Sequence, residues 1–129
     1  MISGERIMSD NNQFVKIVRF VEAVLQRCNV PAHLDGFGYI AESVACKVLH
    51  NPRKWTDIYS FVADLHGIFR HSVSRSVNYI VHTHFGEFCM NFGLNENTVT
   101  ASSVIATLAL YVNHNLLADP ISEVAATRD

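Results

Sequence analysis

The sequence predicts an all-α protein, a compact bundle of about five or six helices with a helix-turn-helix motif at its centre. Apolar side chains recur at the three- and four-residue spacing of amphipathic helices along most of the 129 residues, and no segment shows the alternation typical of a strand. Proline ends three of the helices, and a break of only three residues separates the two others. Such a short break is typical of the helix-turn-helix, although many helical cores also contain one.

Two long helices are expected in the first part of the chain. The run Asp-Asn-Asn at 10–12 offers N-caps for the first helix, whose apolar stripe covers 14–25. This helix ends before Pro31, because the residue that precedes a proline avoids the helical region. A second helix has its apolar face within 37–48 and stops at Pro52.

The middle of the chain predicts the two helices of the motif, at 57–69 and 73–88. They are separated by the break Arg70-His71-Ser72. Three further elements are expected: a turn or short loop at 93–98, a helix from about Thr100 to Leu117 closed by Pro120, and a frayed tail at 121–129.

A single domain is expected to cover residues 1–129, with about 10–119 ordered. Apolar residues make up 49% of the sequence and charged residues 17%, which is ordinary for a compact protein. The N-terminus lacks the apolar centre of a secretory signal, and no apolar run approaches the roughly 20 residues that span a bilayer. Cys28, Cys46 and Cys89 lack a paired spacing and indicate reduced thiols. We therefore expect a cytoplasmic protein without a membrane partner.

The charge is distributed unevenly along the chain. The net charge of −2 is not typical of a nucleic-acid-binding protein, in which basic residues usually exceed acidic ones. The middle segment, 47–86, nevertheless carries five basic against two acidic side chains and five of the seven histidines. If any part of the chain faces phosphate, it is this segment.

The predicted helix 73–88 has an outer face without acidic residues before Glu87. On a helical wheel Val73, Val77, Ile80 and His84 form the inner side, whereas Arg75, Tyr79 and His82 lie opposite, flanked by Ser72, Ser76, Asn78 and Thr83. Arginine can bind guanine edges or phosphate, asparagine can pair with adenine, and hydroxyls bind phosphate. The face therefore suits DNA; the alternative is a solvated face that lacks acids by chance.

One segment resembles a known family. VPAHLDGFGYIAESV, from Val30 to Val44, is similar to the opening of the DNA-binding effector domain of the stage-zero sporulation response regulator of spore-forming Firmicutes. That domain starts with a helix, a Val-Pro-Ala-His turn, a Gly-aromatic pair and a long second helix. The resemblance covers about residues 14–117. Looser matches are Ser74, Arg75, Ile80 and His82 in the recognition helix, and Thr100, Ile105 and Ala106 in the last helix.

This resemblance implies an all-α domain of about six helices, a transcription-factor ancestry and binding to double-stranded DNA as a homodimer or tandem pair. It gives the turn at 29–36 a structural role: His33 is expected to form hydrogen bonds there, and Gly36 to let the chain enter the second helix closely packed. Arg75 is the strongest DNA contact that it implies. Arg70, His71, Ser72 and Ser74 are weaker candidates near the helix N-terminus, where N–H groups favour phosphate.

The chain departs from the family in two respects. The family carries a phosphoacceptor receiver domain ahead of this one, whereas only about a dozen residues are expected to precede the first helix here. The family's recognition helix also has further Arg and Glu residues, where this chain has Ser76, Val77, Asn78 and Val81. Each lost phosphate contact would weaken binding and lower its salt dependence. The family's target sequence is therefore not expected to carry over.

Metal binding and catalysis are weakly supported by the sequence. His82 and His84 are two residues apart, so a helix directs them to different sides, whereas helical zinc pairs are three or four residues apart. No nucleophile elbow, phosphate loop or pair of carboxylates is present. Cys46 and Cys89 are typical of apolar core positions. We expect no metal, no cofactor and no enzymatic activity.

The sequence thus favours a sequence-specific DNA-binding transcriptional regulator. The alternative is a protein-interaction module of the same fold, with weakened DNA binding, that modulates a partner regulator or contacts RNA polymerase. Lys47, Arg53 and Lys54 are expected to contact flanking phosphates. The complete set of predicted DNA-binding residues is Lys47, Arg53, Lys54, Arg70, His71, Ser72, Ser74, Arg75, Asn78, Tyr79 and His82.

Overall fold

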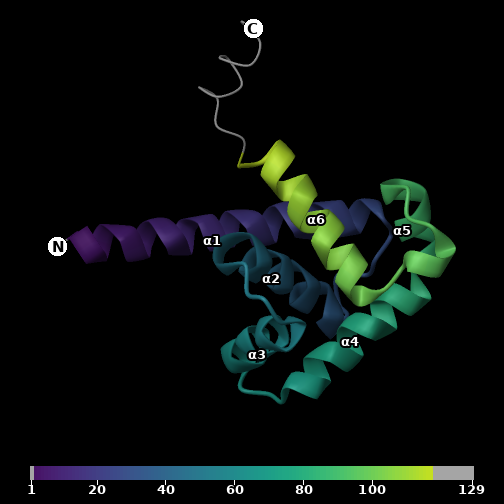
Figure 1. Ribbon diagram of the computed structural model, residues 1–129, viewed down its shortest axis with the longest axis horizontal. Helices are drawn as coiled ribbons and strands as arrows, with labels where there is room; N and C mark the ends of the chain where they lie inside the picture. The colour runs from purple at the N-terminus through teal and green to yellow at the C-terminus, as the bar shows by residue number, and fades with distance from the viewer. Residues whose placement is uncertain (1, 118–129) are drawn as a thin grey trace, which may run out of the picture.

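The computed structural model describes residues 2–117, with side chains from residue 11 onward (Figure 1). Within these residues the chain forms six α-helices and one short 3-10 turn, and no strand. The predicted all-α fold class is confirmed. The elements are α1 (Ile2–Arg27), α2 (Asp35–His50), α3 (Trp55–His66), α4 (Arg70–Thr83), α5 (Phe85–Phe92), the 3-10 turn η1 (Glu96–Thr98) and α6 (Ala101–Asn115).

The second helix, α2, lies at the centre of the bundle. It packs against α1, α3, α4 and α6, and Figure 1 shows it below the long rod of α1 and above α3 and α4. Phe37, Ile40 and Val44 of α2 are buried in the single core that these helices share. Burial of one such side chain contributes about 1.5–3 kcal/mol, so α2 is the scaffold on which its neighbours are positioned.

The turn that leads into α2 brings two helices into very close contact. Gly36 is buried, and a Cβ atom at this position would clash with the main-chain oxygen of Ser76 in α4. The prediction that Gly36 permits close packing is therefore confirmed. His33 also lies in this turn, but its side chain is exposed and forms no hydrogen bond to another described residue, so the hydrogen-bonding role expected for it is wrong.

The first helix begins earlier than predicted. Residues 10–12, expected to cap its N-terminus, lie inside α1, which starts at Ile2. Cap residues are tolerated inside a helix where their side chains remain in solvent, and Asn11 and Asn12 are both exposed. The predicted end is correct, since α1 stops at Arg27 and Asn29 adopts a left-handed conformation with φ 63°.

The boundaries of the two middle helices also differ from the prediction. Gly67, with φ +63°, ends α3 at His66 rather than at residue 69. The next helix, α4, starts at Arg70, so the expected break 70–72 is its first turn. The single helix predicted over 73–88 is instead two helices: α4 ends at Thr83, and α5 follows His84. His84, expected on the inner face, is half-buried at this junction.

The last helix agrees closely with the prediction. Thr100 caps α6: its hydroxyl accepts a hydrogen bond from the Ser103 main-chain N–H, and the Ser103 hydroxyl accepts one from the Thr100 N–H. This capping box satisfies N–H groups that lack a partner within the helix. The predicted loop at 93–98 is confirmed and contains η1. Pro120 and the tail predicted to fray lie outside the described residues.

No helix among the described residues is both long enough and apolar enough to cross a lipid bilayer.

Candidate nucleic-acid interface

The turn between α3 and α4 is only three residues long. The main-chain N–H groups of Gly67 and Ile68 both donate to the carbonyl oxygen of Ala63, which closes the C-terminus of α3. A left-handed residue at this position strongly favours glycine. Phe69 then adopts an extended conformation and begins α4. Because α3 and α4 also pack against each other, the two helices form a tightly connected pair.

One face of α4 is firmly fixed in the core. Val73, Val77, Ile80 and Val81 are all buried and face the neighbouring helices α2, α3 and α6. The first three of these were predicted to lie inward. A helix held by four buried side chains at the spacing of 3.6 residues per turn cannot rotate without exposing them. The direction of its opposite face is therefore determined by the core.

That opposite face is exposed and carries no acidic side chain. Arg75 and His82 are exposed, and 58% of the Tyr79 surface is accessible to solvent. Among the described residues, no Asp or Glu forms an ion pair with Arg75. The predicted exposure of these three side chains is confirmed. The helix itself contains no Asp or Glu at all.

The polar side chains beside this face are less accessible to a ligand than Arg75 and His82. Asn78 and Ser74 are half-buried, and the Asn78 Nδ2 donates to the Ser74 Oγ at 3.3 Å. Ser72 and Ser76 are half-buried as well. A ligand must therefore compete with the bond within the Asn78–Ser74 pair, whereas it can bind Arg75 and His82 directly.

The N-terminus of α4 adds two further cationic or ionisable groups. Arg70 and His71 are exposed in its first turn, where the helix dipole favours an anion. The ring of Phe69 stacks on that of His71, with the centroids 5.6 Å apart and the planes at 10°. Phe69 is nevertheless 74% exposed, so a large apolar side chain lies beside the two basic residues.

An acidic residue that sequence reasoning missed lies next to this face. Asp35, in the first turn of α2, lines a hollow of about 310 Å³ together with Arg75 and Tyr79. Asp35 is brought there by the close contact between Gly36 and Ser76. The face is thus free of acids along α4, but one carboxylate from another helix lies at its edge. No signal in the sequence places Asp35 beside residues forty positions further along the chain.

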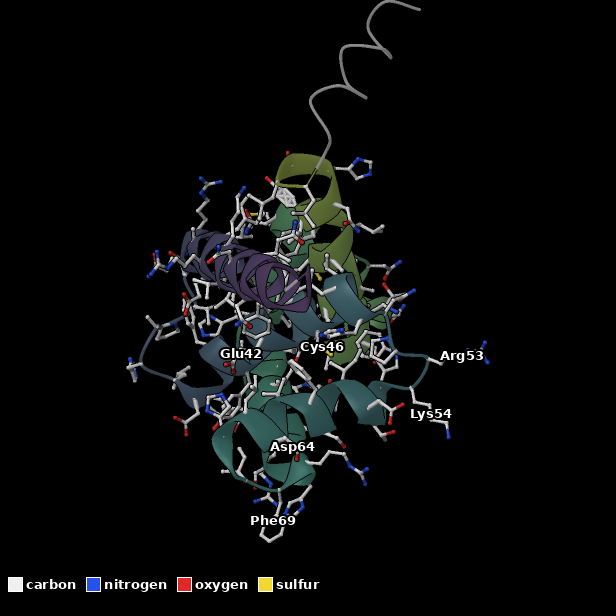
Figure 2. The ribbon with its side chains drawn as sticks, turned by 90° about the vertical axis from the view of Figure 1, so that its left-hand side faces the viewer. Glu42, Cys46, Arg53, Lys54, Asp64 and Phe69 are labelled. Atoms are coloured by element: carbon white, nitrogen blue, oxygen red, sulfur yellow. The ribbon has the colours of Figure 1, made fainter. Side chains whose placement is uncertain are left out.

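The three predicted flanking cations do not lie on α4. Lys47 is half-buried in the last turn of α2, with its Nζ 5.5 Å from the centre of the Trp55 ring. Arg53 and Lys54 are exposed in the loop before α3. Figure 2 shows both projecting from one side of the molecule, whereas Phe69 lies at its lower end. The structure therefore separates Arg53 and Lys54 from the N-terminus of α4.

A polar contact positions α3 on the scaffold. The His66 Nε2 lies 2.6 Å from the Glu42 Oε1, and the His66 ring meets the edge of Tyr39 with 5.0 Å between the ring centroids. His66 is the last residue of α3, whereas Glu42 and Tyr39 belong to α2. This contact holds the C-terminus of α3, and with it the turn that leads into α4.

Two of the three cysteines, Cys28 and Cys46, are poorly suited to nucleophilic chemistry. Burial, with a smaller contribution from Asp57, raises the pKa of the Cys46 thiol to about 11, and burial, followed by Glu87, raises the pKa of Cys28. Because the thiolate is the reactive form, both groups are protonated and inert at neutral pH. Within the part of the chain that the structure describes, no group of three or more His, Cys, Asp or Glu side chains is arranged to hold a metal ion.

A comparison of the chain with known protein families, with curated proteins and with solved structures gives no match. The function assigned to the α4 face therefore depends on its own residues and geometry.

Proposed function

We propose that this protein is a transcriptional regulator that binds double-stranded DNA, with α4 as the recognition helix of a helix-turn-helix formed by α3 and α4. The observation that carries the proposal is the exposed, acid-free face of a helix whose orientation is fixed by four buried residues. A rigid helix with a protruding polar face is what the major groove admits.

Each residue of the face has a role in this proposal. Arg75 binds a guanine edge or a phosphate, and Tyr79 and His82 contact bases or backbone. Arg70 and His71 bind phosphate together with the N–H groups at the start of α4. Asn78 reads adenine only when its bond to Ser74 opens. Arg53 and Lys54 remain candidates for flanking phosphates, whereas Lys47 is the weakest because its ammonium group lies over Trp55.

The proposal predicts weak non-specific binding with a modest salt dependence. Few cations are available, and each phosphate contact contributes about −0.9 to the slope of log affinity against log salt. The net charge of −2 also does not attract DNA from a distance. Binding as a homodimer or tandem pair would compensate, since two recognition helices then contact one duplex.

The experiment is a fluorescence anisotropy titration of a labelled random-sequence duplex at several salt concentrations between about 50 and 200 mM. Arg75→Ala should weaken binding and lower the salt slope by about 1 on this duplex, and should cost about 1–3 kcal/mol, roughly five- to 150-fold, on a duplex in which Arg75 reads a base. Arg19→Ala is the matched control, because Arg19 is an exposed arginine on α1 and should leave the affinity unchanged. Absence of binding at the lowest salt, or equal affinity in both variants, contradicts the proposal.

A second candidate function has its own supporting observation. Leu65 and Phe69, on either side of the α3–α4 turn, are 51% and 74% exposed. Large exposed apolar side chains beside a proposed DNA face suit contact with a partner regulator or RNA polymerase. This protein-interaction function predicts that Phe69→Ser abolishes association with such a partner, measured by size-exclusion chromatography of the purified pair, and that DNA binding is not detected even at low salt.

A further inference from the structure

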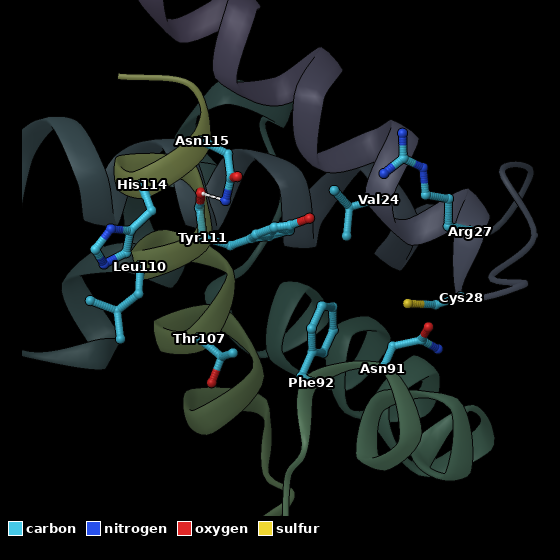
Figure 3. Close-up of a pocket in the computed structure, with 10 residues that line it drawn as sticks. All are labelled: Val24, Arg27, Cys28, Asn91, Phe92, Thr107, Leu110, Tyr111, His114 and Asn115. Carbon is cyan, nitrogen blue, oxygen red and sulfur yellow. Dashed lines mark hydrogen bonds between the residues drawn. The ribbon is translucent and has the colours of Figure 1, made fainter. Parts of the chain in front are cut away.

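A cavity lies where the C-terminal ends of α1, α5 and α6 come together. Its volume is about 450 Å³, and the last turns of α1 and α5 and the C-terminal half of α6 surround it (Figure 3). Cavities of roughly 300–1,000 Å³ hold small-molecule ligands in many proteins. No residue of α4 lines this cavity, so it is separate from the face proposed to bind DNA.

The inner surface of the cavity is mainly aromatic and aliphatic. Figure 3 shows the rings of Phe92 and Tyr111 and the thiol of Cys28 directed into the same space, which Val24 also lines. Phe92 comes from α5 and Tyr111 from α6, so two aromatic rings from different helices face the cavity. An aromatic ring favours contact with a planar apolar group, which can stack on its face or meet its edge.

The charged side chain that lines the cavity is Arg27, at the end of α1. Its guanidinium lies at the α1 rim (Figure 3), and among the described residues no Asp or Glu forms an ion pair with it. His114 lines the outer edge and is cationic when protonated, and no carboxylate lines the cavity at all. A guanidinium presents a planar fork of donors that fits a carboxylate or sulfonate.

Two features of the surroundings disfavour the binding of an anion: the C-termini of three helices and the carboxylate of Glu87. Three helices end at the cavity, and each C-terminus carries roughly half a negative charge. Several carbonyls at these ends already accept hydrogen bonds: Asn91 donates to the Glu87 oxygen, and Asn115 to the Tyr111 oxygen. The three helix ends together carry more negative charge than Arg27 offsets, so the contribution of Arg27 depends on its direct, charge-assisted hydrogen bonds to the anionic group. Glu87 adds a further opposing charge, since it contributes, after burial, to the raised pKa of Cys28, which lines the cavity.

From this combination we infer that the cavity binds a small molecule that joins a planar apolar ring to one anionic group. The ring occupies the space between Phe92 and Tyr111, and the anionic group binds Arg27. The inference does not depend on DNA binding, since α4 takes no part in the cavity.

The test uses two fluorescent probes that share one ring system. Anilinonaphthalene sulfonate carries the anionic group, and phenyl-naphthylamine lacks it. The sulfonate should bind saturably, one molecule per chain, and at least about tenfold more tightly than the neutral probe, a ratio that corresponds to one charge-assisted hydrogen bond. Amide chemical-shift changes should fall in the last turns of α1, α5 and α6, and leave α4 unaffected.

Three variants decide the role of charge. Arg27→Met should weaken binding of the sulfonate about tenfold and leave the neutral probe unchanged, whereas Glu87→Gln should strengthen sulfonate binding several-fold. Arg19→Met, on the same helix but outside the cavity, is the matched control and should bind like the unmodified protein. Equal affinity of the two probes, unchanged affinity in both Arg27→Met and Glu87→Gln, or shift changes on other helices would overturn the inference.

Discussion

The helices α2 and α4 pack against each other, but they differ in the fraction of their residues that is buried in the core. Eight of the sixteen residues of α2 are buried, including Phe37 on one turn and Cys46 near its end. In α4 four of fourteen are buried, and Arg75, Tyr79 and His82 face solvent. A larger fraction of α2 than of α4 is therefore fixed by packing, and the exposed side chains of α4 are available to a ligand. Substitutions in α2 should change stability, and those on the outer face of α4 should change binding.

The largest expected effect comes from the centre of α2. Ile40 is fully buried, so Ile40→Ala should lower the free energy of unfolding by about 2–5 kcal/mol, because the substitution leaves a cavity that the neighbours fill only in part. Urea denaturation followed by circular dichroism measures this loss. Tyr79→Ala, on the exposed face of α4, should shift stability by no more than about 0.5 kcal/mol. Similar losses in the two variants would remove the distinction between the helices.

Alkaline pH should lower the free energy of unfolding, because the thiol of Cys46 in α2 is buried. The pKa of Cys46 rises from 9.0 to about 11 on folding, so the unfolded chain loses its proton first. The stability linked to Cys46 is complete below pH 9 and falls as the pH rises toward 11, by roughly 2–3 kcal/mol in all. Urea titrations at several alkaline pH values should show a steeper decline in the unmodified protein than in Cys46→Ala. Parallel declines would show that the Cys46 thiol ionises equally well in both states.

The contact between the two helices can be tested at a pair of glycines. Gly36→Ala places a Cβ against the Ser76 main chain and should cost about 1–3 kcal/mol of stability, since backbone has to move. Gly38→Ala is the matched control in the same helix. No atom lies within 4 Å of a Cβ at that position, so alanine should stabilise α2 by about 0.5–1 kcal/mol. Thermal unfolding of both variants measures the difference, and the same sign for both would contradict the close contact.

The smallest expected effect comes from Asp35, a residue of α2 that lies beside the outer face of α4. Removing this carboxylate in Asp35→Asn should strengthen DNA binding by about 0.5–1 kcal/mol, because a negative charge beside Arg75 is lost. The same change should cost α2 about 0.3–1 kcal/mol of stability, since an acidic side chain favours the helix N-terminus. Anisotropy titrations and urea denaturation measure the two quantities. Weaker DNA binding by this variant would show that phosphate does not approach Arg75.

Much of this architecture could be predicted from the apolar period. The spacing of Val73, Val77 and Ile80 identifies the buried side of α4 and thereby the exposure of Arg75, because a helix repeats every 3.6 residues. The division at His84 could not be predicted in the same way, because the apolar spacing continues across it to Phe88. Gly67 did carry a signal for the end of α3, since glycine at a helix C-terminus favours the left-handed conformation.

The surroundings of the candidate site were less accessible to sequence reasoning. Asp35 lines the same hollow as Arg75 only because two helices distant in sequence pack closely at Gly36. Lys47 looks like a free cation in the sequence, yet its ammonium group lies over the ring of Trp55. Both facts depend on tertiary packing, which no periodicity of a single segment contains.

The most direct test of the account is a titration of isotopically labelled protein with a DNA duplex, followed by amide chemical shifts at low salt. If the outer face of α4 binds DNA, the changes will be concentrated in Arg70–Thr83 and the preceding turn, will disappear as salt is added, and will be greatly reduced in Arg75→Ala. Changes centred on α1 or α6, or a spectrum that DNA leaves unaltered, would contradict the central claim.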